Sequence, residues 1–106
     1  EIVNGLVGSE MCIRDRRIRA IEAVTDVPLV IHGSSGVPVP QRTALARTSS
    51  ICKYNIGTEL RMAFGAALRD AVGADPDRFD RVQILKETHD PVVAAARRVL
   101  AALKPT

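Results

Sequence analysis

The chain has 106 residues, of which 46% are hydrophobic, 25% charged and 3% aromatic, with a formal net charge of +3. This composition indicates a soluble globular class, and the chain has no apolar run long enough to cross a bilayer. The scarcity of aromatic side chains argues against nucleic-acid binding by base stacking. The two cysteines, Cys12 and Cys52, cannot form a disulfide framework, and we expect Cys52 to be a small buried hydrophobic residue in a reducing, cytoplasmic compartment.

The first sixteen residues require separate treatment. Residues 5–16, GLVGSEMCIRDR, look like the in-frame translation of a sequencing adapter, whereas the origin of residues 1–4 is not accounted for. We therefore expect residues 1–16 to be a non-native segment and leave them out of the fold prediction, as one does with a tag. The alternative is a genuine strand, turn and helix at the start of a domain.

The next part of the chain predicts a helix, a strand and a short polar loop. Residues 17–24 carry apolar residues three apart, which is typical of a helix. From Val27 to Ile31 an apolar run predicts a strand that is buried on both faces, as in parallel sheets. It ends at His32, and the loop from Gly33 to Gly36 offers unobstructed backbone N–H groups that could hold a phosphate.

A second unit repeats this plan. The spacing predicts a short helix from Gln41 to about Thr48 and a strand starting at Ile51, followed by a polar loop and another helix. Strand and helix alternate, so we expect parallel strands. Side chains alternate along a strand, and His32 and Asn55 both lie at a carboxyl end, so we expect these two side chains to converge.

The rest of the chain predicts helices. Thr58 is expected to cap the helix that follows it, with Gly73 as its stop. The predicted inward face of this helix consists of Leu60, Phe64, Ala67, Leu68, Ala71 and Val72. A turn at Asp75 and Pro76 precedes one long helix from about Val82 to Leu103, with Pro91 in its first turns or at a kink.

Three segments of the chain resemble the C-terminal part of class II, zinc-dependent fructose-bisphosphate and tagatose-bisphosphate aldolases. They are VPLVIHGSSGVP at residues 27–38, CKYNIGTELR at residues 52–61 and DPDRFD at residues 75–80. They occur in the order of the family and close to its spacing, so the resemblance covers nearly everything from Arg17 onward. In the family the turn before the second strand usually carries an alanine, an apolar residue and a glycine, whereas this chain has Thr48, Ser49 and Ser50.

The resemblance implies a fold and a domain assignment. Residues 17–106 would be the C-terminal fragment of an aldolase (β/α)8 TIM barrel, an α/β fold, and would contain its last two parallel strands, their helices and the C-terminal helices. Because such a barrel takes about 250 residues, we expect an incomplete barrel. The full-length parent would be a cytoplasmic homo-oligomer that acts on a phosphosugar, with no nucleic-acid or membrane partner.

The resemblance also implies a role for individual residues. His32 matches one of the three histidines that hold the catalytic Zn2+, and Asn55 matches the residue that contacts the oxygenated carbons of the substrate. Gly33, Ser35 and Thr58 match positions that bind the phosphate of dihydroxyacetone phosphate, and the resemblance implies that Ser34 and Gly57 also belong to the substrate-binding residues. Relatives often have Asp, Asn or Ala at the position of Gly57; backbone donation there survives the change, but a side-chain contact does not.

The implied reaction is the reversible aldol cleavage of fructose 1,6-bisphosphate, or of tagatose 1,6-bisphosphate, to dihydroxyacetone phosphate and glyceraldehyde 3-phosphate. Zinc would act as a Lewis acid on the bound triose, and a catalytic zinc site uses three protein ligands. The other two histidines and the acidic proton-transfer residue should lie upstream of this chain. We therefore expect the fragment by itself to be inactive.

Two other readings remain open. Lys53 could be the Schiff-base nucleophile of a metal-free barrel aldolase, although a lysine that lines the barrel or pairs with a carboxylate is the simpler interpretation. Alternatively, the fragment could belong to a non-catalytic phosphate-binding barrel protein that kept the loops and lost the metal site.

Overall fold

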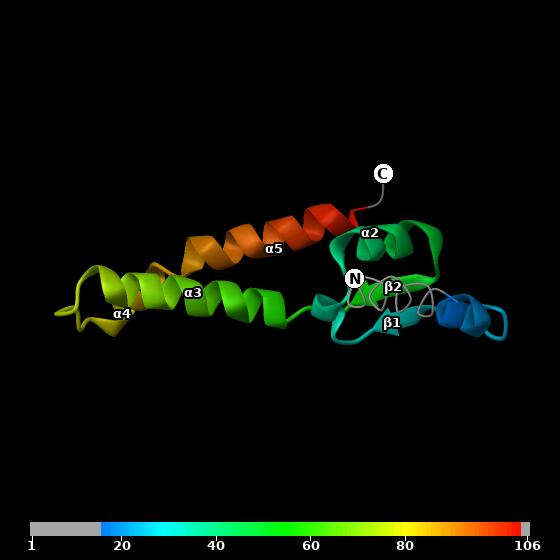
Figure 1. Ribbon diagram of the computed structural model, residues 1–106, viewed down its shortest axis with the longest axis horizontal. Coiled ribbons are helices and arrows are strands. Elements are labelled where there is room, and N and C mark those ends of the chain that lie inside the picture. The colour runs from blue at the N-terminus through cyan, green and yellow to red at the C-terminus, as the bar shows by residue number, and fades with distance from the viewer. Residues whose placement is uncertain (1–15, 105–106) are drawn as a thin grey trace, which may run out of the picture.

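The structure, a computed structural model, describes residues 16–104, which form a small parallel sheet and several helices (Figure 1). Residues 16–22 are helical and lead towards the first strand. The elements that follow are β1 (Leu29–Ile31), the 3-10 turn η1 (Ser34–Gly36), α2 (Val39–Thr48), β2 (Ile51–Tyr54), α3 (Thr58–Ala74), α4 (Arg81–Lys86) and α5 (His89–Leu103).

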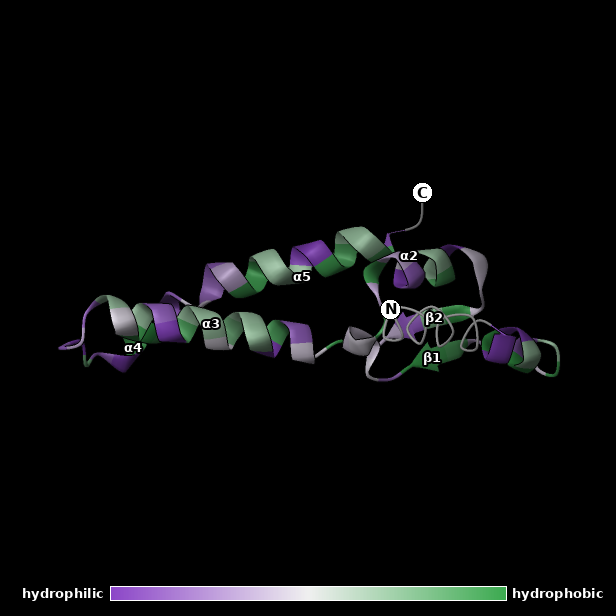
Figure 2. Cartoon of the chain, viewed as in Figure 1, coloured by the Kyte–Doolittle hydropathy of each residue, from purple (hydrophilic) through white to green (hydrophobic). Residues whose placement is uncertain are grey.

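The two strands pair in parallel, as the alternation of strands and helices predicts. β1 is shorter than the apolar run that predicts it, but the ladder continues past both strands. The backbone N–H of Asn55 donates to the carbonyl of Ile31 at 2.9 Å, and the N–H of Ser34 donates to the carbonyl of Asn55 at 3.1 Å. β1 is hydrophobic along its length, and β2 turns hydrophilic towards its carboxyl end (Figure 2).

The prediction that Cys52 is buried is wrong, because its side chain is exposed. The register pairs Leu29 with Ile51 and Val30 with Lys53, so Cys52 is an extra residue in β2 at a bulge. A bulge breaks the strict alternation of faces, and Cys52 and Lys53 are both exposed while Ile51 is buried. In the described part of the chain, moreover, β2 has a neighbouring strand on one side only.

Helix α2 covers the sheet and begins at Val39, two residues earlier than predicted. Pro40 lies in its first turn, where a backbone N–H would have no acceptor within the helix, so proline costs no hydrogen bond there. Leu45 faces inward and is buried together with Ile51 of β2. The Thr43 hydroxyl, also on α2, donates to the carbonyl of Ala102 at 2.8 Å and holds the end of α5 against α2.

The turn from α2 to β2 is held by the helix at residues 16–22. The Arg19 guanidinium donates to the carbonyl of Thr48 at 2.9 Å and to its hydroxyl at 3.2 Å. The N–H of Ser50 donates to the Glu22 carboxylate at 2.5 Å, and this bond, with help from Arg19, lowers the pKa of Glu22. Thr48 and Ser50 thus join the turn to the helix at residues 16–22.

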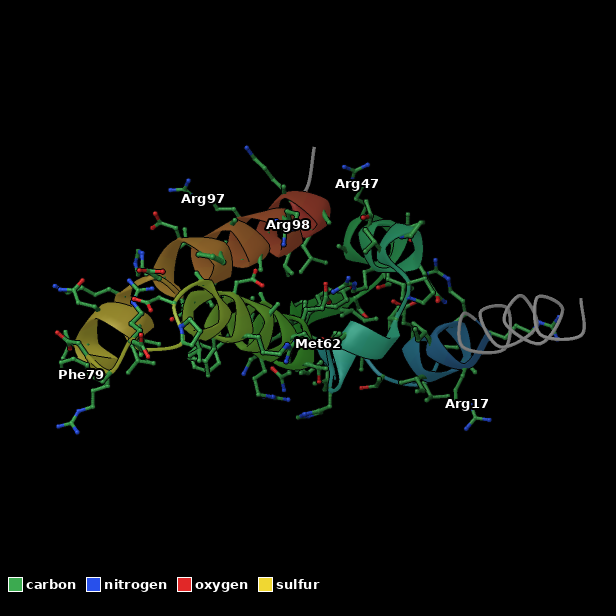
Figure 3. All side chains as sticks on the ribbon, turned by 60° about the vertical axis from the view of Figure 1, so that its left-hand side comes forward. Arg17, Arg47, Met62, Phe79, Arg97 and Arg98 are labelled. Atoms are coloured by element: carbon green, nitrogen blue, oxygen red, sulfur yellow. The ribbon has the colours of Figure 1, made fainter. Side chains whose placement is uncertain are left out.

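Helices α3 and α5 lie side by side and form an arm that extends from the sheet, with α4 at its far end (Figure 1). Ala67, Ala71 and Ala95 are buried, and their small side chains permit close packing. The predicted inward face of α3 is therefore only partly correct, since Phe64 and Val72 are exposed on the side that no described element covers. Figure 3 shows Phe79, 91% exposed, at the far end of the arm.

The predicted single helix from Val82 to Leu103 is two helices. Asp80 caps α4 by accepting from the N–H groups of Val82 and Gln83, and α5 starts at His89. Pro91 lies in the first turn of α5, where it has no N–H to donate to the carbonyl of Glu87, so a continuous helix through this point would lose a hydrogen bond. His89 is exposed, and its Nδ1 lies 2.9 Å from the carboxylate of Asp90.

The described residues thus form a mixed helix and strand structure that is compatible with part of an α/β fold. A closed barrel is not seen in this part of the chain, which contributes two strands. No helix among residues 16–104 is both long enough and apolar enough to cross a membrane. Residues 1–15, which include most of the segment interpreted as adapter, lie outside the described range.

Candidate functional site

The loop after β1 is held in shape by one glycine and one buried serine. Gly33 has φ of +65°, a left-handed conformation that side-chain-bearing residues disfavour. Ser34 is fully buried, and its hydroxyl donates to the carbonyl of Ile31 at 3.1 Å. The N–H of Ser34 also donates, to the carbonyl of Asn55, so Ser34 shapes the loop from the inside, and its contact with a substrate stays a prediction.

His32 and Asn55 meet at the carboxyl ends of the two strands, as their positions predict. Asn55 Nδ2 lies 2.9 Å from His32 Nδ1. The parallel ladder brings the two residues to the same edge of the sheet, and the exposed His32 ring is open to solvent there. The imidazole of His32 and the carboxamide of Asn55 therefore lie together at one edge of the sheet.

The start of α3 is tied to the loop after β1. The prediction that Thr58 is the N-cap is wrong, because Thr58 is the first helical residue and Gly57 holds the cap position without a side chain. The backbone N–H of Glu59, in the first turn of α3, has no acceptor within the helix and donates to the Ser35 hydroxyl at 3.2 Å. A serine from one loop thus performs the capping function for the helix that follows the other strand.

A polar pocket of about 520 Å³ opens between these two loops. Its lining consists of Gly33, Ser35, Tyr54, Asn55, Ile56, Gly57, Thr58 and Arg61. The lining contains every predicted substrate-binding position except Ser34. The positive end of the α3 dipole faces this region, so the pocket suits an anion on electrostatic grounds.

A buried ion pair joins α2 to the first turn of α3. Arg42, whose side chain is 3% exposed, donates to both carboxylate oxygens of Glu59, at 2.6 and 3.3 Å. The Tyr54 hydroxyl donates to the carbonyl of Arg42 at 3.4 Å, and burial raises the pKa of Tyr54. Sequence reasoning missed this brace, since no local pattern indicates that Arg42 points inward.

A second, apolar cavity of about 410 Å³ lies beside the site. It is lined by strand and helix residues that include Leu29, Ile31, Leu45 and Ile51, and His32 and Gly33 stand at its border. Its chemistry is that of an unfilled hydrophobic core, whereas the polar groups gather in the other pocket.

Lys53 lacks the environment that a Schiff-base lysine needs. Its side chain is exposed on β2, opposite Val30 in the register. A nucleophilic lysine requires desolvation or a cationic neighbour that lowers its pKa. The described residues do not bury Lys53.

The described residues offer a ligand for the predicted zinc site. His32 offers an imidazole, which is a common zinc ligand, at an exposed strand end. Among residues 16–104 there is no group of three or more His, Cys, Asp or Glu side chains that could hold a metal ion. This part of the chain can therefore supply one ligand of a catalytic zinc site but does not complete one.

The described residues form two parallel strand-and-helix units with a polar pocket at the carboxyl ends of the strands, which is compatible with part of an α/β protein. The family model for class-II fructose-bisphosphate aldolase matches residues 3–106, so the chain belongs to the class-II fructose-bisphosphate aldolase family. No solved structure matches the chain. The family match supports a lyase function of the aldolase type, and this family is generally zinc-dependent.

The matched range begins at residue 3 and thus includes residues 5–16. The interpretation of those residues as translated adapter, and the division of the chain at residue 17, stay predictions.

Proposed function

We propose that the chain supplies the phosphate-binding end and one zinc ligand of a ketose-bisphosphate aldolase that reversibly cleaves fructose or tagatose 1,6-bisphosphate. One observation carries the proposal: the His32 and Asn55 side chains meet 2.9 Å apart at the edge of the sheet where the polar pocket opens. The alternative with a Lys53 Schiff base lacks comparable support, because Lys53 is exposed.

The phosphate of the dihydroxyacetone phosphate moiety would lie in the pocket between the two loops. Gly33 and Gly57 expose backbone there, and Ser35 and Thr58 add hydroxyl groups. The α3 dipole favours the negative charge. Binding energy at the phosphate would orient the distant reacting carbons, which is how a remote contact assists an aldol cleavage.

Asn55 would hold the oxygenated carbons of the triose next to His32. Its backbone is locked on both sides, since its N–H donates to Ile31 and its carbonyl accepts from Ser34. The side-chain amide of Asn55 is therefore attached to a backbone that is held in place, and it can contact the substrate from there. Such preorganisation keeps the donor in place while negative charge develops on the substrate oxygens.

His32 would hold the zinc ion, which when bound acts as a Lewis acid on the ketone and hydroxyl of the triose. A neutral imidazole carries one proton, so a ring that accepts at Nδ1 keeps its proton on Nε2. An amide can turn either its nitrogen or its oxygen to the ring. With Oδ1 of Asn55 as the acceptor, Nδ1 would hold the proton and Nε2 would be free for a metal. The remaining ligands would come from outside the described residues.

Titration of the 106-residue chain with dihydroxyacetone phosphate tests the proposal. We expect the backbone amide resonances of residues 33–36 and 57–59 to shift in a saturable way, because these N–H groups line or adjoin the pocket. Dihydroxyacetone without phosphate should bind far more weakly. Equal shifts with both compounds, or shifts confined to α4 and α5, would contradict a phosphate site between the loops.

Gly33→Ala should weaken this binding, with Gly36→Ala as the matched control. A Cβ has open space at both glycines, but only Gly33 has a positive φ. Alanine at Gly33 is strained by about 1–2 kcal/mol, and relief of that strain would turn the loop amides away from the pocket. We expect the dissociation constant for dihydroxyacetone phosphate to rise about tenfold in Gly33→Ala and to change little in Gly36→Ala. Equal effects in the two variants would show that the loop conformation is not what binds phosphate.

A further inference from the structure

The side chain of Arg61 folds back over the start of its own helix. Its Nη2 donates to the Thr58 hydroxyl at 3.3 Å. A Cβ placed on Gly57 would lie only 2.7 Å from Nη1 of Arg61, a distance shorter than real Cβ contacts. The guanidinium can therefore take this position only because residue 57 has no side chain.

This position brings a positive charge to the polar pocket. Among the described residues that line the pocket, Arg61 is the only one with a charged side chain. The other polar groups of the lining are hydroxyls, an amide and backbone N–H groups. A phosphate dianion in the pocket would thus meet one full positive charge, and a guanidinium can donate two parallel hydrogen bonds to it.

We propose that Arg61 is a phosphate-binding residue of this aldolase and that Gly57 is the residue that admits it to the pocket. The inference rests on the proposed function and adds a specificity determinant to it. Arg61 selects a triose that carries a phosphate dianion over the unphosphorylated triose. Gly57 exposes its backbone to the pocket, and the space left by its missing side chain acts through Arg61.

The chain contains a matched control two helical turns further along α3. Gly65 and Arg69 have the same spacing as Gly57 and Arg61, and Nη1 of Arg69 lies 3.5 Å from where a Cβ on Gly65 would stand. Arg69 does not line the pocket between the two loops. Arg69→Gln therefore reproduces the change in charge on α3, and Gly65→Ala adds a Cβ beside an arginine, without touching the proposed contact.

The test is titration of the 106-residue chain and its variants with dihydroxyacetone phosphate. We expect Arg61→Gln to raise the dissociation constant about 10- to 100-fold, the range for a lost charge-assisted contact. Arg61→Lys should fall between Arg61→Gln and the unmodified chain. Gly57→Ala should weaken binding in the same direction, and adding it to Arg61→Gln should have no further effect, because both changes remove the same contact. Arg69→Gln and Gly65→Ala should leave binding unchanged.

A second measurement follows the Nε–Hε resonance of Arg61 in the unmodified chain, which should shift with the phosphorylated compound only. If the unmodified chain binds dihydroxyacetone phosphate but Arg61→Gln binds equally well, or this resonance does not move, the role of Arg61 is overturned and the phosphate site stands. If the unmodified chain does not bind the compound at all, both proposals fail. Gly57 has φ of −133°, which alanine also adopts, so Gly57→Ala tests space and not backbone strain.

Discussion

Replacing Glu59 by alanine is expected to destabilise the chain more than any other single change at the site. Arg42 is 3% exposed, and its buried Nε has no hydrogen-bond partner among residues 16–104, so the carboxylate of Glu59 provides its main compensation. Removing one partner of a buried pair costs roughly 3–5 kcal/mol. Because the Glu59 side chain is 34% exposed and water can enter, we expect about 2–3 kcal/mol here.

Amide hydrogen exchange in α2 and in the first turns of α3 measures this loss. A cost of that size corresponds to exchange that is faster by about 30- to 150-fold. Glu59→Gln keeps the shape and one acceptor oxygen and should lie between alanine and the unmodified chain. The double variant Arg42→Met with Glu59→Leu should recover most of the protection, since no buried charge is left alone. Unchanged exchange in Glu59→Ala would show that the pair does not brace the site.

The second large effect concerns zinc. The 106-residue chain, loaded with zinc and then dialysed at neutral pH, is expected to keep less than about 0.1 zinc ion per chain, because three protein ligands are the norm for a catalytic site. The described residues offer His32 and no group of three metal-ligating side chains. The retained metal is measured by elemental analysis.

His32→Ala is the control for this measurement, and it should retain as little zinc as the unmodified chain. Retention of one zinc ion per chain would contradict the prediction. Should zinc be retained, its loss in His32→Ala would identify His32 as one of the ligands. Asn55→Asp, which replaces an amide with a carboxylate beside the ring, should raise the zinc content if the two side chains can bind one ion together.

The sequence determined the parts of the site that depend on strand periodicity. A β-branched run that ends in His32, and a second run that ends in Asn55, predict two parallel strands whose carboxyl ends share an edge. The structure pairs those strands in parallel and places the two side chains 2.9 Å apart. The motif around Gly57 likewise indicated the family to which the chain belongs. These features are local, because each follows from the side-chain period of one strand or from the residues of one loop.

The tertiary structure alone decided the contacts between segments that are distant in sequence. The pairing of Arg42 with Glu59 and the capping of Glu59 by Ser35 join different loops and helices. The bulge that exposes Cys52 arises from how two strands align, and alternation within one strand cannot predict it. The inward turn of Ser34 and the position of Arg61 over Gly57 depend on side-chain conformations and on the space that neighbours leave. Local patterns carry no information on such space, since packing between elements sets it.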